Sequence, residues 1–306
     1  MLKLINFKYS QQVYFNLFYN NTYPLPVDNS AFVIEEIKLL KETIANKENP
    51  LIAAVDNLTP EISLKNVQDL RHQLIEYNRW EREADFATEQ QSQGAIANTL
   101  KYLKTLNDEV VEGKPEIEDR PAYLEWAVWR GFLAIDEIVG EVHKTRRFSI
   151  DQDFLPRNTA PGGGSDLIFE FETYVLVVEV TLTTSHRQMA VESEPVRRHT
   201  VQYKNLFSNK DVYCLFIAPE VDNNVAETFR IGVWYKGDNE EFINIVPMSL
   251  SDFIKTIAAL QIRRYRNHDF RNLLDKCLIS RNVRAPQWKN SISKEIDNWT
   301  QKVVNS

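Results

Sequence analysis

Two carboxylate side chains stand where the sequence otherwise predicts a β-hairpin. The stretches 166–172 and 174–182 are rich in branched and aromatic residues and are separated by a short turn, which predicts two paired strands. Asp166 begins the first strand, and Glu179 lies inside the apolar run of the second, where an unpaired carboxylate is costly. Glu179 therefore needs a partner or a metal ion, although a purely structural role for either acid is the alternative.

In a hairpin of this length the two acids can converge at one end of adjacent strands. Asp166, Glu179 and the backbone carbonyl of Val180 then predict a Mg²⁺ site, because this ion prefers oxygen ligands and keeps positions open for water and phosphate. Further carboxylates can reach the same cleft from neighbouring segments. These are Glu125 at the edge of the preceding helix, and Glu192 or Glu194 in the following loop.

Cationic side chains flank these acids in the sequence on both sides of Pro195. The candidates for binding DNA phosphates are Arg187, Arg197, Arg198 and His199. A metal ion polarises a phosphoryl oxygen and helps to generate hydroxide, while arginines stabilise charge that develops in the transition state. This combination favours hydrolysis of phosphodiester bonds. The alternative is a helix whose arginines pair only with neighbouring glutamates.

Three of the nine glycines in the chain are consecutive, at 162–164, directly before Ser165 and Asp166. Glycine permits unusual backbone dihedrals and close approach of a large ligand. The loop is therefore predicted to lie against a polymer while it delivers Asp166 to the start of its strand. A flexible surface turn is the alternative interpretation.

The remaining pattern predicts a helical domain over residues 1–120 and an α/β domain over 121–306. The first domain shows no residues suited to chemistry and ends in an acidic linker. In the second, a mixed central sheet is flanked by helices. The expected helices lie at about 31–46, 60–77, 95–106, 121–142, 195–206 and 249–260, and the expected further strands at 212–218, 229–235 and 243–246.

Composition places the chain among ordinary globular proteins. It has 306 residues, of which 43% are hydrophobic and 26% charged, and a net charge of −7. No apolar run is long enough for a membrane span, and the first residues do not resemble a secretory signal, so a cytoplasmic protein that does not contact the membrane is expected. Cys214 and Cys277 lack metal-type spacing and are expected to be buried thiols.

Positive charge is concentrated near the end of the chain. Residues 261–290 carry eight Lys and Arg against two Asp, with aromatic residues interleaved. This segment is predicted to be helical and can give non-specific affinity for a DNA backbone that weakens steeply with salt. A solvated helix face is the commoner explanation of such a run.

The strings Pro161 to Asp166, Val178 to Thr184 and Glu192 to His199 resemble the cleavage domain of AlwI-type type IIS restriction endonucleases and the related nicking enzymes. The resemblance covers about residues 122–260. It implies a restriction-endonuclease-like PD-(D/E)XK fold with Asp166 and Glu179 as metal-binding acids, Val180 as carbonyl donor, and Glu125 and Glu192 as accessory acids. Thr181 replaces the lysine of the general nuclease pattern, so the resemblance does not assign the group that activates water.

Family members of the complete type carry a long N-terminal DNA-recognition region, and the first 120 residues here resemble only the linker that follows it. This difference implies a truncated gene product, a subunit that depends on a partner for site recognition, or a nuclease of relaxed specificity. The expected activity is Mg²⁺-dependent hydrolysis of double-stranded DNA, as a type II restriction endonuclease or a nicking subunit that works with a second nuclease or recognition subunit. The alternative is a DNA-binding subunit or remnant without productive chemistry.

Overall fold

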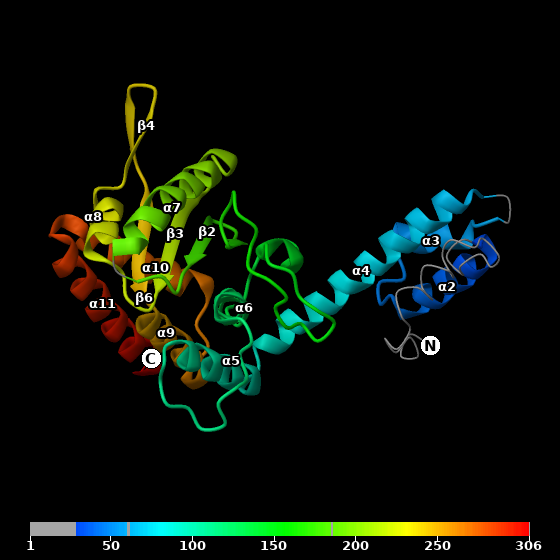
Figure 1. The fold of residues 1–306 in the computed structure, drawn as a ribbon, viewed down its shortest axis with the longest axis horizontal. Coiled ribbons are helices and arrows are strands. Elements are labelled where there is room, and N and C mark those ends of the chain that lie inside the picture. Colours follow the sequence, from blue (N-terminus) through cyan, green and yellow to red (C-terminus); the bar gives the residue numbers. More distant parts are fainter. Residues whose placement is uncertain (1–28, 60–61, 185, 306) are drawn as a thin grey trace, which may run out of the picture. The chain divides into compact units, whose positions relative to one another are not determined.

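A computed structural model describes residues 29–59, 62–184 and 186–305 of the chain. The chain forms two compact units, one reaching to Arg82 and the other running from Glu83 to Ser306 (Figure 1). Helix α4 (Leu64–Gln90) contributes residues to both units. The compact units thus divide earlier than the domains predicted at residue 120, because α5 (Gln93–Leu106) packs on helices of the second unit.

In the first unit, α2 (Ser30–Thr43), α3 (Pro50–Asp56) and the first part of α4 form a small helical core. Asn29 caps α2 by accepting a hydrogen bond from the backbone N–H of Ala31 at 2.9 Å, as expected for this residue type. Short α3 was not predicted. The predicted start of the next helix at Pro60 lies outside the described residues, and α4 continues well beyond the predicted end at Tyr77.

The second unit is built on a four-stranded sheet in the order β1-β2-β3-β6. The strands are β1 (Leu167–Glu170), β2 (Tyr174–Val180), β3 (Asp211–Ala218) and β6 (Asn244–Ser249). β1 pairs with β2 in antiparallel register, whereas β2, β3 and β6 run parallel. The predicted hairpin and the mixed α/β sheet are therefore confirmed. β2 and β3 are almost wholly buried, as strands covered on both faces must be.

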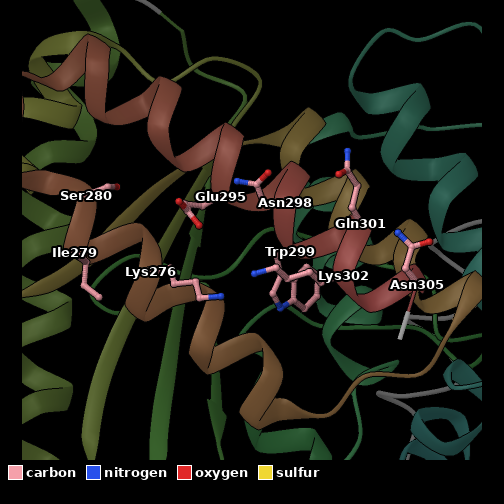
Figure 2. A pocket seen from close by; sticks show the side chains of 9 residues that line it. All are labelled: Lys276, Ile279, Ser280, Glu295, Asn298, Trp299, Gln301, Lys302 and Asn305. Carbon is pink, nitrogen blue, oxygen red and sulfur yellow. The ribbon is translucent and has the colours of Figure 1, made fainter.

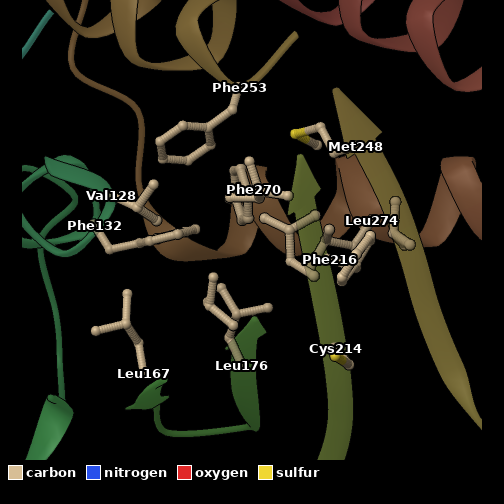
Figure 3. Packing of buried hydrophobic residues seen from close by; sticks show 14 of the residues in the cluster. Val128, Phe132, Leu167, Leu176, Cys214, Phe216, Met248, Phe253, Phe270 and Leu274 are labelled. Carbon is tan, nitrogen blue, oxygen red and sulfur yellow. The ribbon is translucent and has the colours of Figure 1, made fainter. Parts of the chain in front are cut away.

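Helices cover both faces of this sheet. On one face, Phe132 of α6 (Arg120–Leu133) packs against Phe169, Phe253 and Phe270, which belong to β1, α9 (Leu250–Ile262) and α10 (Asn267–Ile279) (Figure 3). On the other face lie α7 (His186–Leu206) and α8 (Asn223–Ile231), whose Phe229 contacts Phe216 of β3. Helix α11 (Ala285–Asn305) packs on α8, α9 and α10.

The helix predicted over 121–142 is shorter than expected. α6 ends at Leu133, and the chain then adopts positive φ angles at Glu137 (77°) and Gly140 (116°) before the 3₁₀ helix η3 (Val142–Thr145). Left-handed residues interrupt a right-handed helix, so the apolar spacing beyond Leu133 does not reflect helical structure.

Helix α7 begins nine residues before the predicted start at Pro195 and contains this proline. Proline removes one helical hydrogen bond and crowds the carbonyl of residue 191. Val191 is 49% exposed, so water can solvate that carbonyl and the helix can tolerate the break.

The strand predicted over 229–235 is also wrong at its start. Phe229 belongs to α8, which Asp222 caps and Gly232 ends. Strand β4 (Val233–Lys236) follows and pairs with β5 (Asn239–Phe242) in a separate two-stranded sheet, the projecting hairpin of Figure 1.

Both cysteines are buried and free, as predicted. Within the described ranges, no helix is long and apolar enough to cross a membrane. The basic segment 261–290 is largely helical, and several of its cations bind groups inside the unit. Arg271 pairs with Asp211 and lies over the ring of Tyr174, while Lys289 donates to the carbonyl of Val221 at 2.6 Å.

Helices α6 and α9 pack closely at Gly131, which has no side chain. A Cβ at Gly131 would lie 3.1 Å from Cζ of Phe253 and 3.2 Å from Cδ1 of Ile257. We expect Gly131→Leu to destabilise the protein by about 1–3 kcal/mol through overpacking. A Cβ at Gly94 of α5 would meet nothing within 4 Å, so Gly94→Ala should stabilise by about 0.5–1 kcal/mol. Urea denaturation followed by tryptophan fluorescence measures both, and equal stability of the two variants would contradict this packing.

Candidate active site

The antiparallel register of β1 and β2 brings the two predicted metal-binding acids together. Leu167 pairs with Val178, and the same register continued by one residue places Asp166 opposite Glu179. Oδ2 of Asp166 accepts a hydrogen bond from the backbone N–H of Val180 at 2.8 Å. The hairpin thus holds both carboxylates on the sheet face that α7 covers, since Glu179 reaches His199 of that helix.

Burial makes ionisation of these acids costly. Glu179 is 7% exposed, and burial together with the negative charge of Glu192 raises its pKa to about 8. Burial also raises the pKa of Asp166, and the charge of Glu179 raises it further. Such perturbed carboxyls in a cleft are typical of functional sites.

Glu125 joins this pair from the opposite side of the cleft. Helix α6 starts at an N-cap, Asp119, with a proline in the first turn, and this fixed start sets the position of Glu125 one and a half turns on. Oε2 of Glu125 accepts a hydrogen bond from the backbone N–H of Ala160 at 2.7 Å. Burial raises the pKa of Glu125, and the charge of Asp166 adds to the rise.

Glu192 comes from α7 and not from a loop, because that helix starts earlier than predicted. Burial raises the pKa of this half-buried acid, while a side-chain hydrogen bond with Thr181 opposes the rise. The charge of Glu192 acts on both Asp166 and Glu179. Thr181, the residue in the lysine position, is therefore a hydrogen-bonding partner of the fourth acid.

The arrangement is suited to an ion that takes few protein ligands. In the described part of the chain, no three His, Cys, Asp or Glu side chains form a ready-made metal cage. Asp166, Glu179 and the Val180 carbonyl instead offer hard oxygen donors beside two further acids, and a divalent cation would relieve the repulsion that raises their pKa values. Ions such as Mg²⁺, which keep several of their own waters, fit this donor set.

The predicted phosphate-binding cations do not all reach the acids. Arg187 lines the cleft, and Arg198, which pairs with Glu194 at 3.2 Å, lies close enough to lower the pKa of Glu179. Arg197 instead donates to the carbonyl of Val233 at 2.7 Å, at the base of the β4–β5 hairpin. Its guanidinium thus has a structural partner where a phosphate contact was expected.

The side chain of His199 points inward and contacts Glu179 of the acid pair. Its Nδ1 lies 2.7 Å from Oε1 of Glu179, and the ring is 5% exposed, so it cannot contact a DNA backbone as predicted. Burial and the charges of Arg198 and Arg147 lower the pKa of His199, which favours the neutral ring with a proton on Nδ1 donated to Glu179. His199 therefore orients a carboxylate.

Arg147 is a site residue that the sequence did not reveal. Its charge lowers the pKa of Asp166, Glu179 and His199, and its guanidinium contacts the glycine loop. It stands 19 residues before Asp166 in a segment without helical or strand periodicity. Only the folding of this segment against β1 brings it to the acids.

Glu125 and the end of β2, directly after Glu179, line a cleft of about 560 Å³. Its walls include Glu125, Leu124, Val180, Thr181, Thr184 and Arg187. A groove of about 670 Å³ lies elsewhere, between α10 and α11 (Figure 2). This groove contains Lys276, Lys302 and Glu295. The smaller cleft is the better candidate for chemistry, because it is lined by Glu125 and by Val180, which follows Glu179.

The raised pKa of Asp166 makes a prediction about stability. Because folding raises this pKa from 3.8 to about 8, the folded protein loses stability as pH rises between these values. Asp166→Asn keeps an acceptor for the Val180 N–H and removes the charge. We expect it to stabilise the metal-free protein by about 1–3 kcal/mol at pH 8, and by less at pH 5.

Thermal unfolding in EDTA at both pH values measures this difference. Asp238→Asn is the control, because Asp238 is exposed in the turn of the β4–β5 hairpin and should leave stability unchanged at either pH. A destabilised Asp166→Asn variant at pH 8 would show that the carboxylate is compensated in the folded state.

Comparisons with known proteins bear on the family and the fold of this chain. No curated protein matches the sequence. Among solved structures, the fold is similar to the small subunit (R.BspD6I2) of the heterodimeric restriction endonuclease R.BspD6I, with a TM-score of 0.52 and 21% sequence identity over 66% of this chain and 98% of that one. The model of the AlwI restriction endonuclease family matches residues 3–256. The chain therefore belongs to the AlwI restriction endonuclease family.

Proposed function

We propose that this protein is a Mg²⁺-dependent endonuclease that hydrolyses phosphodiester bonds of double-stranded DNA. The observation that carries the proposal is the convergence of Asp166, Glu179 and the Val180 carbonyl, with Glu125 and Glu192 beside them, at one cleft of a restriction-endonuclease fold. Four mutually repelling acids are costly to bury, and cation-dependent chemistry on a polyanion is the function that explains them.

Asp166, Glu179 and the Val180 carbonyl would hold the ion. Bound Mg²⁺ would polarise a phosphoryl oxygen and lower the pKa of the attacking water. Glu192, whose pKa is raised by burial, would be the group that accepts a proton from water. The Thr181 hydroxyl orients this carboxylate. His199 holds Oε1 of Glu179 through its Nδ1 proton.

Two arginines are placed to meet the phosphate. Arg187 lies at the wall of the cleft, and Arg198 lies close to Glu179 on α7. Each would stabilise negative charge on the phosphoryl oxygens as it develops. With DNA as its substrate, the protein is expected to act in the cytoplasm.

One set of converging acids in the described residues implies one cut in one strand. The similar structure is the small subunit of a heterodimeric enzyme, which supports a partner for this chain as well. We therefore propose that cleavage of both strands, and recognition of a DNA site, require a second subunit.

The first test of the proposal is cleavage of supercoiled plasmid in Mg²⁺, beside EDTA. Asp166→Asn and Glu179→Gln should each lower the rate at least about a hundredfold, because each removes charge from the metal-binding pair. Glu172→Gln is the matched control on the same hairpin, since Glu172 is exposed in the turn and should cleave like the wild type. Cleavage by Asp166→Asn at the wild-type rate would refute the site.

The product distinguishes a nicking subunit from an enzyme that cuts both strands. We expect open-circular plasmid to accumulate before any linear form, at every protein concentration, because one site handles one phosphodiester at a time. Direct appearance of linear DNA would contradict this expectation. A folded wild type that binds DNA but does not cleave it would favour the catalytically unproductive subunit.

A further inference from the structure

Arg147 is held beside the start of β1 by its neighbour. Arg146 forms a two-point ion pair with Glu83, at 2.6 Å and 2.7 Å, and Glu83 is fully buried. Arg146 also forms a β-bridge with Leu167, and the backbone N–H of Arg147 donates to the carbonyl of Asp166 at 3.3 Å. The backbone of this dipeptide is thus fixed to the strand that begins with Asp166.

Consecutive side chains of an extended segment point to opposite sides. While Arg146 turns to α4, Arg147 turns to the glycine loop, where Nη1 donates to the carbonyl of Ser165 at 3.3 Å and Nη2 to the carbonyl of Gly162 at 3.5 Å. The planar fork of a guanidinium presents donors from two separate nitrogens in a fixed geometry, whereas an ammonium must reach both acceptors from one nitrogen. Arg147 therefore ties together the two ends of the loop 162–165.

Gly164 makes room for this guanidinium. A Cβ at Gly164 would lie 2.5 Å from Nη1 and 3.0 Å from Cζ of Arg147. The other two glycines of the run have different surroundings: nothing lies within 4 Å of a Cβ at Gly162 or Gly163, and Gly163 has a φ of +94°. At Gly164, therefore, the absence of a side chain leaves the space that the guanidinium of Arg147 occupies.

The charge of Arg147 also acts on the acids. Burial raises the pKa of both Asp166 and Glu179, and Arg147 opposes the rise in each. Its guanidinium therefore lies within electrostatic reach of both carboxylates.

We propose that Arg147 is a positioning residue of the nuclease site, and that Gly164 is the position that admits its guanidinium. By clamping the loop 162–165, Arg147 fixes the place of Asp166 opposite Glu179. This inference rests on the proposed nuclease function, because the role of Arg147 is to hold a metal-binding acid. The proposal explains the glycine run by a contact within the protein, whereas the sequence predicted that a polymeric ligand approaches this loop.

A double-mutant cycle tests the inference on the full chain. Arg147→Gln and Gly164→Ala should each lower the single-turnover rate at saturating DNA and Mg²⁺ at least about tenfold, because small misplacements of a reacting group are costly. The double variant should be no slower than Arg147→Gln alone, since both changes break the same contact. Effects that multiply in the double variant would overturn the proposed coupling.

Matched controls separate the clamp from general effects. Gly162→Ala has open space, and Arg157→Gln removes the same charge at an exposed position of the following loop, so both should cleave at the wild-type rate. Arg147→Lys keeps the charge without the fork and should stay within about threefold of Arg147→Gln. Full rescue by lysine would overturn the clamp and leave only a charge effect.

Two readouts do not depend on cleavage. Calorimetric titration with Mg²⁺ should show a Kd for Arg147→Gln at least about threefold weaker than that of the wild type, because Asp166 is no longer held opposite Glu179. A wild-type Kd for this variant would overturn the positioning of Asp166 by Arg147. The same cycle measured by thermal unfolding should give a double variant that unfolds at the temperature of Arg147→Gln.

These readouts also keep the two proposals distinguishable. A wild type that never cleaves would refute the proposed function, while an unfolding cycle that is not additive would still support the contact of Arg147 with Gly164. Additive unfolding shifts in an active enzyme would refute the inference and leave the nuclease function standing.

Discussion

The structure depends on the cost of burying carboxylates that repel one another at the end of a β-hairpin. Asp166 and Glu179 face each other across β1 and β2, and burial of both raises the pKa of each. Few donors compensate them: the Val180 N–H donates to Asp166, while His199 Nδ1 and the backbone N–H of Asp166 donate to Glu179. Burial of the apolar sheet around the acids offsets the free-energy cost of burying them, since β2 and β3 are buried almost throughout. A site of this kind can form in the folded protein, and its uncompensated negative charge is the basis for the proposed binding of a cation.

Helix α7 supplies the side chains that complete the acid cluster beside the sheet. Glu192 and His199 are seven residues apart, which is two helical turns, so both lie on the face of α7 that looks toward the hairpin. This works only because the helix continues through Pro195. Gln188 fixes the first turns: its amide donates to the carbonyls of Thr183 and Glu220 and its oxygen accepts from Asp222. The irregular segment after β2 is thereby attached to the helix that completes the acid cluster.

The sequence predicted the hairpin and its two acids because branched and aromatic residues favour strands and a charged residue in an apolar run has few explanations. It did not predict the extent of α7, since a proline usually marks a helix start and only the exposure of Val191 shows why this one is tolerated. Nor did the sequence predict which of the cationic side chains lie close to the acids. Arg197, Arg198 and His199 are adjacent in sequence, but their helical positions direct them to Val233, Glu194 and Glu179 respectively. Arg147 was missed because its place depends on a β-bridge between distant segments.

The same electrostatic constraint explains why a threonine can occupy the lysine position. In the general nuclease pattern this lysine brings a positive charge to the acids. Here that charge is supplied from elsewhere in the fold, since Arg147 and Arg198 both lower the pKa of Glu179 while Thr181 bonds to Glu192. A lysine at 181 would compete for Glu192 and add a further cation beside a metal ion. The proposed roles of Glu192 and Arg147 thus divide between two residues what one lysine does in the general nuclease pattern.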